Sequence, residues 1–136
     1  MSATHEFLDH TSELRLRLRG DTFEALLGEA GRALGGLLLA EAGRSRSAAP
    51  RKFEVEGHDR ATLLVDWLNE ILYVAEVDRW VLTGLETLCL SGTVLRAHAV
   101  GVSVPVSPAR IKAATLHDLD VKAVPGGILA EVVLDV

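Results

Sequence analysis

The chain has 136 residues, about the length of one domain, and 49% of them are hydrophobic, which excludes a disordered chain. The net charge of -5 opposes the phosphate neutralisation on which direct nucleic-acid binding depends. With only 4% aromatic residues, a platform for stacking single-stranded bases is also excluded. We therefore expect no strong direct binding to nucleic acid, and the acidic balance favours a protein partner or a bound cation.

Cysteine content and the N-terminal sequence indicate where the protein works. Cys89 stands alone, which excludes an intrachain disulfide and a zinc site built from thiolates. The first ten residues lack the basic and apolar regions of a signal peptide, and no window reaches the roughly 18 apolar residues of a membrane span. We expect a cytoplasmic protein that does not associate with membranes.

The first half of the chain predicts two strands and a helix. Residues 5–9 form a short strand, and residues 13–19 alternate strictly between leucine and a charged residue. The leucines should face the core, while the arginines form an outward basic stripe opposite acidic neighbours such as Glu6. A capping box over residues 21–24, with Asp21 as the cap, should begin a helix whose apolar positions recur every three or four residues up to Leu38.

The second half predicts one more helix and a succession of strands. Residues 40–52 gather Ser, Gly, Arg and Pro, and we expect a mobile surface connection there. A third strand around residues 53–56 precedes a helix that Asp59 caps. Five further strands follow, at residues 81–90, 93–104, 111–116, 119–124 and 128–134. This order predicts a single α+β domain, with a largely antiparallel or mixed sheet and two amphipathic helices.

A dense acidic turn is the first candidate site. Asp9, His10 and Glu13 fall within five residues of one another, together with two hydroxyl side chains. Oxygen ligands at this density suit a hard divalent cation such as calcium, magnesium or manganese. The alternative is a polar turn whose side chains only satisfy backbone amides.

The end of the chain is the second candidate site. Asp135 shares a strand face with Glu131 and is followed only by Val136, whose main-chain carboxylate would lie near it. These carboxylates could complete a cation site with the acidic turn if the first and last strands lie side by side. The alternative is a frayed terminus.

Two further groups of polar residues are candidates. Lys112 could dock an acidic partner, and His117 could transfer protons, although a solitary strand lysine is usually only solvated. Polar residues along the second helix are explained by solvation. They are Asp66, Asn69, Glu70 and Tyr73.

Five segments, in order and spacing along the whole chain, resemble the archease family. They are residues 5–13, 20–25, 64–73, 111–117 and 134–136. Archeases are small α+β proteins that assist the RtcB-type RNA ligase, which joins RNA ends through a guanylylated histidine in tRNA splicing and RNA repair. The resemblance implies a noncatalytic helper that promotes GTP-dependent guanylylation of its ligase and renews that state between turnovers.

The resemblance also implies particular residues. The family's divalent metal site falls on Glu13, Asp135 and Val136, and its partner-contacting stretch falls on Lys112 and His117. Three departures from the family pattern stand out: Glu13 replaces a shorter aspartate, Leu116 replaces a tyrosine, and the loop over residues 104–110 is shorter. Glu13 would shift the cation outward or weaken its binding.

The sequence is also compatible with two other functions. One is a small metal-dependent hydrolase that uses Asp9, His10 and Glu13 with a bound water. The other is an interaction or chaperone-like module whose metal site has decayed through the change at Glu13.

Overall fold

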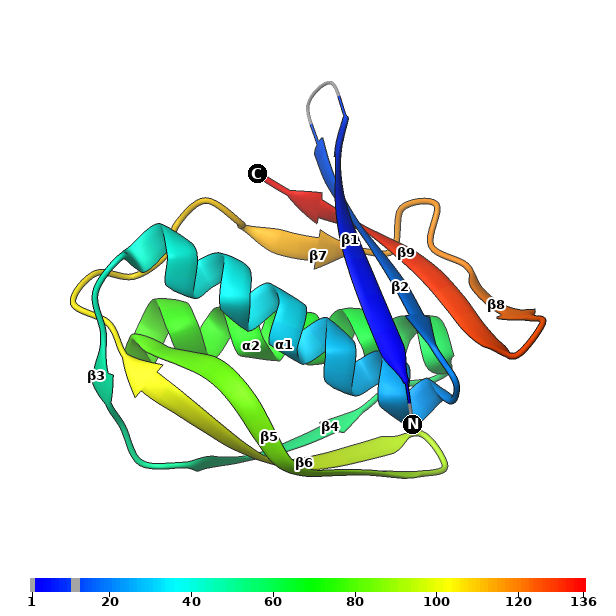
Figure 1. The fold of residues 1–136 in the computed structure, drawn as a ribbon, viewed down its shortest axis with the longest axis horizontal. Helices are drawn as coiled ribbons and strands as arrows, with labels where there is room; N and C mark the ends of the chain where they lie inside the picture. The colour runs from blue at the N-terminus through cyan, green and yellow to red at the C-terminus, as the bar shows by residue number, and fades with distance from the viewer. Residues whose placement is uncertain (1, 11–12) are drawn as a thin grey trace.

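The fold combines two helices with two antiparallel sheets (Figure 1), and it is known from a computed structural model that describes residues 2–10 and 13–136. The elements in these residues are β1 (Ala3–His10), β2 (Glu13–Gly20), α1 (Phe23–Ala42), β3 (Arg46–Ser47), β4 (Arg51–Glu56), α2 (Arg60–Asp78), β5 (Trp80–Ser91), β6 (Val94–Ser103), β7 (Ala113–Thr115), β8 (Val121–Val124) and β9 (Gly127–Asp135). The predicted α+β class is confirmed, but the strands divide into two sheets instead of forming one.

Sheet A has the order β1-β2-β9-β7, with β8 also paired to β9, and sheet B has the order β3-β6-β4, with β5 also paired to β6. Figure 1 shows the two helices side by side between the sheets. Helix α1 contacts β1 and β2 on one side and β5 on the other, while α2 contacts β4, β5 and β7. This arrangement buries the leucines of β2 in the core, as their alternation predicts.

Helix α1 begins one residue later than the capping box predicts. Thr22 is the N-cap, and its hydroxyl accepts a hydrogen bond from the Ala25 N–H at 3.1 Å. The prediction that Asp21 caps the helix is wrong, because its carboxylate accepts from the Ser2 N–H at 2.8 Å. This long-range contact with the start of the chain cannot be read from the local sequence.

The glycines of α1 allow close packing against its neighbours. A Cβ added at Gly31 would lie 2.9 Å from the Trp67 ring, and one added at Gly35 would collide with the main-chain carbonyl of Leu82. The glycines lower the helix propensity of α1, but they let the helix approach α2 and β5 more closely than larger residues would.

Helix α2 begins where the sequence predicts, at the Asp59 cap. The Asp59 carboxylate accepts from the Thr62 N–H at 2.8 Å, and the Thr62 hydroxyl oxygen accepts from the Asp59 N–H at 3.0 Å. Further along the helix, the indole N–H of Trp67 donates to the Leu27 carbonyl of α1 at 2.8 Å, so the largest core side chain is also hydrogen-bonded. This bond fixes the two helices to each other.

The segment over residues 40–52 contains regular structure that the sequence analysis missed. Helix α1 continues to Ala42, where the Gly43 N–H caps it by donating to the Leu39 carbonyl at 3.1 Å. Strands β3 and β4 then pair with β6. These pairings join residues about 50 positions apart, which explains why local composition indicated only a loop. No helix of the described residues is long and apolar enough to cross a membrane.

Candidate functional site

The outer face of sheet A gathers most of the charged residues considered above. Strands β2 and β9 are antiparallel neighbours, and Arg17 lies opposite Glu131. Side chains alternate along a strand, so Glu13, Arg15 and Arg17 share the face that carries Glu131 and Asp135. The outward direction of the arginine stripe is therefore as predicted.

Arg15 is the centre of this face. Its Nε and Nη2 atoms lie 2.8 Å and 2.7 Å from Oε1 of Glu13, and its Nη1 atom lies 3.3 Å from Oε1 of Glu131. Asp118, in the turn after β7, is 3.7 Å from Nη2. The hydrogen bond to Glu13 is the main reason why the pKa of Arg15 is raised above its usual value, and the contact with Glu131 adds to it.

The expected acidic neighbour of the arginine stripe is confirmed, but the ion pair is made with a different residue. Glu6 lies opposite Arg17 in the β1–β2 register. The ion pair of Arg17 is nevertheless with Glu131, at 3.1 Å from Nε to Oε2. Sequence analysis placed Glu131 on the correct face but could not identify β9 as the neighbour of β2, because that pairing spans more than 100 residues.

The structure brings the acidic turn and the end of the chain together, although through β2 instead of the first strand. Strand β1 pairs with β2, and β9 pairs with β2 on the other side. Leu14 lies opposite Leu134, so Glu13 and Asp135 occupy adjacent strand ends. Val136 follows Asp135 directly and is 46% exposed.

The carboxylates at these strand ends are of the type that binds hard divalent cations. Both Arg15 contacts go to Oε1 of Glu13, and within the described residues its second oxygen, Oε2, accepts no hydrogen bond. In the same residues, no group of three or more His, Cys, Asp or Glu side chains is arranged to hold a metal ion. Glu13 and Asp135 are only two such side chains, and the predicted cation stays a prediction.

Asp9 does not share the face of Glu13. It lies opposite Leu14 in the β1–β2 register, and Leu14 is buried in the core. Alternation therefore places Asp9 on the helix-facing side of sheet A, whereas Glu13 is on the outer side. This separation argues against a hydrolase site that joins Asp9 to Glu13. Part of the acidic turn, Thr11 and Ser12, lies outside the described residues.

The predicted partner-binding residues flank the edge strand β7. Lys112 is exposed immediately before the strand, and its main-chain N–H donates to the Asp135 carbonyl at 2.8 Å. His117 follows the strand, with its side chain 66% exposed and its Nε2 atom 3.1 Å from Oδ2 of Asp118. Both residues are therefore accessible, and Lys112 is joined through the backbone to the end of β9.

Asn69 of α2 fixes β7 in place, a role that sequence analysis missed. Its side-chain Oδ1 accepts from the Ala114 N–H at 2.8 Å, and its Nδ2 donates to the Ala114 carbonyl at 3.1 Å. The side-chain amide of Asn69 thus makes the hydrogen bonds to Ala114 that a neighbouring strand would make if β7 were not at the edge of the sheet. The sequence placed Asn69 on the polar side of its helix, and no local signal distinguishes this contact from solvation.

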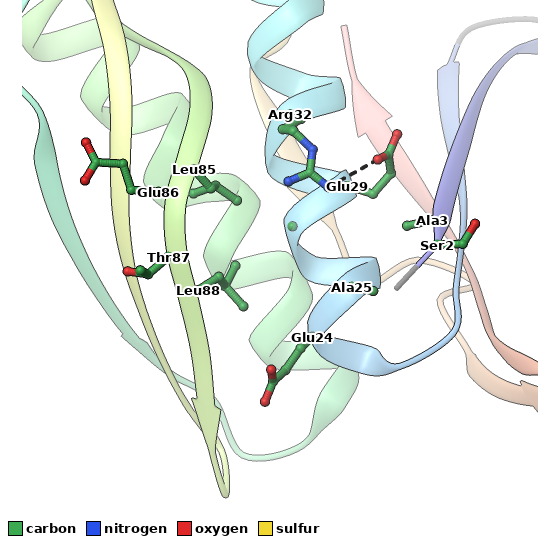
Figure 2. Close-up of a pocket in the computed structure, with 11 residues that line it drawn as sticks. Ser2, Ala3, Glu24, Ala25, Glu29, Arg32, Leu85, Glu86, Thr87 and Leu88 are labelled. Atoms are coloured by element: carbon green, nitrogen blue, oxygen red, sulfur yellow. Dashed lines mark hydrogen bonds and ion pairs between the residues drawn. The ribbon is translucent and has the colours of Figure 1, made fainter.

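A groove of about 520 Å³ lies elsewhere, between α1 and β5 and beside the start of β1 (Figure 2). Leu85 and Leu88 of β5 border it, and Arg32 on α1 lies 3.4 Å from Glu29. Oε2 of Glu29 is also 2.6 Å from Nδ1 of His5, which ties α1 to β1. None of the predicted site residues borders this groove, so it is separate from the face of sheet A described above.

Comparison with known proteins agrees with this fold over nearly the whole chain. The model of the archease protein family matches residues 5–136. The "Protein archease" of Methanopyrus kandleri is 33% identical over 139 residues, covering 96% of this chain and 97% of that protein. The "Protein archease" of Methanosarcina barkeri is 30% identical over 141 residues, covering 97% of this chain and 95% of that protein.

Two solved structures share the fold. The solution structure of Methanobacterium thermoautotrophicum protein 1598 has a TM-score of 0.73 at 24% identity and covers 97% of this chain and 98% of that one. The crystal structure of a Thermotoga maritima archease, titled a possible chaperone, has a TM-score of 0.64 at 20% identity and covers 98% of both chains. With the family model and the curated relatives, these findings show that the chain belongs to the archease family.

Proposed function

We propose that this protein is a noncatalytic activator of an RtcB-type RNA ligase, which it helps to become guanylylated by GTP in tRNA splicing or RNA repair. Membership of the archease family supports the proposal. The observation that carries it furthest is the grouping of Glu13, Asp135 and Lys112 at one end of sheet A, where the main chain of Lys112 is hydrogen-bonded to that of Asp135. An exposed edge with both charge signs suits contact with another protein.

In this proposal, Glu13, Asp135 and Val136 hold a calcium, magnesium or manganese ion. When bound, the ion would supply positive charge to phosphate oxygens in the nucleotide pocket of the ligase. Glu13 contributes the carboxylate oxygen that Arg15 leaves free. Lys112 and His117 contact the ligase from either end of β7, whose position Asn69 holds.

Single-turnover guanylylation of the purified ligase with GTP, with and without this protein, tests the function. We expect the protein to accelerate the reaction and Asp135→Ala to remove most of the acceleration. Glu56→Lys is a suitable control, because Glu56 is exposed on β4 in the other sheet. An unchanged guanylylation rate with the wild-type protein rules out the activator function. Full acceleration by Asp135→Ala rules out the role proposed for the Asp135 carboxylate.

A further inference from the structure

The exposed side of α2 carries a narrow stripe of four residues. Most of the helix is buried against α1 and the strands, and its exposed residues include Asp66, Glu70, Tyr73 and Val77. Their spacings of four, three and four positions place them along one side of the helix. We call these four residues the α2 stripe.

The apolar half of the α2 stripe is exposed. Tyr73 and Val77 are 57% and 56% exposed, and their side chains are neighbours because they lie four positions apart on the helix. Leaving two large apolar side chains together in water forgoes the stabilisation that burial would give. Exposed apolar groups of this kind mark interaction sites, and tyrosine is enriched among the residues that dominate binding energy.

The other half of the α2 stripe is acidic. Within the described residues, neither Asp66 nor Glu70 makes an ion pair or a side-chain hydrogen bond. The α2 stripe contains no basic residue that could neutralise them. A surface with a basic rim around an apolar pocket therefore complements this side of α2 in both charge and hydrophobicity.

The α2 stripe adjoins the segment assigned to partner binding. Asn69, next to Glu70 in the chain, holds Ala114 of β7 through two hydrogen bonds. About two turns further along α2, Glu76 borders a small cavity of about 200 Å³ together with Lys112. A protein that contacts Lys112 can thus extend its contact across β7 onto α2.

The charges of the α2 stripe indicate which kind of molecule binds there. A second copy of this chain that docked symmetrically would place like carboxylates against each other, which disfavours a homodimer through this face. RNA would be repelled by the same carboxylates. Of the three kinds of partner, a protein with a basic surface is therefore the one that the α2 stripe favours.

We propose that the α2 stripe docks onto a basic, partly apolar surface of the RtcB-type RNA ligase, with Tyr73 as the apolar anchor and Glu70 and Asp66 paired with its lysines or arginines. This inference rests on the proposed function and adds a second contact surface to Lys112 and His117. The α2 stripe contributes affinity, whereas Asp135 contributes to the acceleration itself.

The test is a dose-response measurement of single-turnover ligase guanylylation, made with Tyr73→Ala, Glu70→Lys and the control Glu56→Lys. We expect Tyr73→Ala to raise the half-maximal protein concentration about tenfold, with the maximal acceleration preserved. Glu70→Lys should also raise the half-maximal protein concentration, and it should make that concentration less dependent on salt. Because the residues are exposed, thermal unfolding monitored by circular dichroism should show wild-type midpoints for all three variants.

The outcomes separate this inference from the proposed function. Acceleration by the wild type, with Tyr73→Ala and Glu70→Lys matching its half-maximal concentration, overturns the docking surface and leaves the activator function standing. An equal loss in Glu56→Lys also overturns it, because net charge would then explain the effect. If the wild type neither binds nor accelerates the ligase, the activator function and this surface both fail.

Discussion

Arg15 is the residue on which the charge balance of the candidate site depends. It contacts carboxylates from three separate segments, Glu13 on β2, Glu131 on β9 and Asp118 after β7. The guanidinium therefore occupies one side of the carboxylate that is predicted to hold a cation. A divalent ion at Glu13 would be repelled by this fixed positive charge.

Arg15→Gln should strengthen divalent-cation binding, because it removes the positive charge beside Glu13. We expect calorimetric titration with calcium, magnesium and manganese to give a dissociation constant roughly fivefold lower for the ion that binds, as expected for the loss of one partly exposed charge interaction. Arg17→Gln is the matched control, because its ion pair is with Glu131 and not with Glu13. Equal affinities of Arg15→Gln and the wild type would show that Arg15 does not oppose the ion.

Asp59 connects the stability of α2 to pH. The pKa of its carboxyl lies below its usual value, mainly because the backbone N–H of Thr62 donates to it and secondly because the Thr62 hydroxyl does so. A carboxyl with a lowered pKa in the folded state stabilises the fold above its unfolded-state pKa, and this contribution is lost as the pH falls through the folded-state value. The pH window lies below about 4.

Asp59→Ala should lower the thermal unfolding midpoint at pH 7 by about 2–6 °C, as expected for the loss of an N-cap. The difference from the wild type should shrink as the pH falls below about 4, because the wild-type carboxylate then becomes protonated. Asp21→Ala should have a smaller effect, since Asp21 does not cap α1. Thermal melts over a range of pH check this, and a pH-independent difference would contradict the link to the carboxylate.

At the scale of elements, two adjacent glycines of α1 have opposite roles. A Cβ at Gly35 would collide with the Leu82 carbonyl of β5, whereas one at Gly36 would meet nothing within 4 Å. Gly35→Ala should destabilise the protein by about 1–3 kcal/mol through overpacking. Gly36→Ala should stabilise it by about 0.4–1 kcal/mol, because alanine favours the helix. Urea unfolding measures both, and equal effects would contradict the close approach of α1 to β5.

The position of β7 depends on one side chain of another element. Asn69→Ala removes both hydrogen bonds to Ala114, so we expect the Ala114 amide to exchange its hydrogen at least tenfold faster by NMR. Glu70→Gln, at the next position, should leave that rate unchanged. Unaltered exchange in Asn69→Ala would show that pairing with β9 alone holds the strand.

The sequence predicts where helices and strands form better than it predicts which of them lie next to each other in the fold. The alternation of residues 13–19 and the Asp59 cap identified β2 and the start of α2, because these signals are local. The two-residue strand β3, by contrast, exists only through its pairing with β6, about 55 residues away. For the site, the sequence could join the acidic turn to Asp135 only on the condition that the first and last strands are neighbours, whereas β9 pairs with β2. Asn69 and the contacts of Arg15 depend on tertiary packing.

At the scale of the whole molecule, the charge of -5 is unevenly arranged. On the outer face of sheet A, carboxylates are balanced by Arg15 and Arg17, while on the α2 stripe Asp66 and Glu70 have no such partners in the part of the chain that the structure describes. The α2 stripe and the end of sheet A adjoin at β7. One partner can therefore contact both surfaces, which is consistent with a small helper that docks on a larger enzyme.

A sealing assay that starts from pre-guanylylated ligase, with RNA in excess, determines whether the protein acts on the guanylylation state of the ligase. We expect the first round of RNA joining to be unaffected by the protein, because the ligase is already charged. Every later round requires new GTP-dependent guanylylation and should be accelerated. Acceleration of the first round to the same extent, or no acceleration of later rounds, would contradict the account.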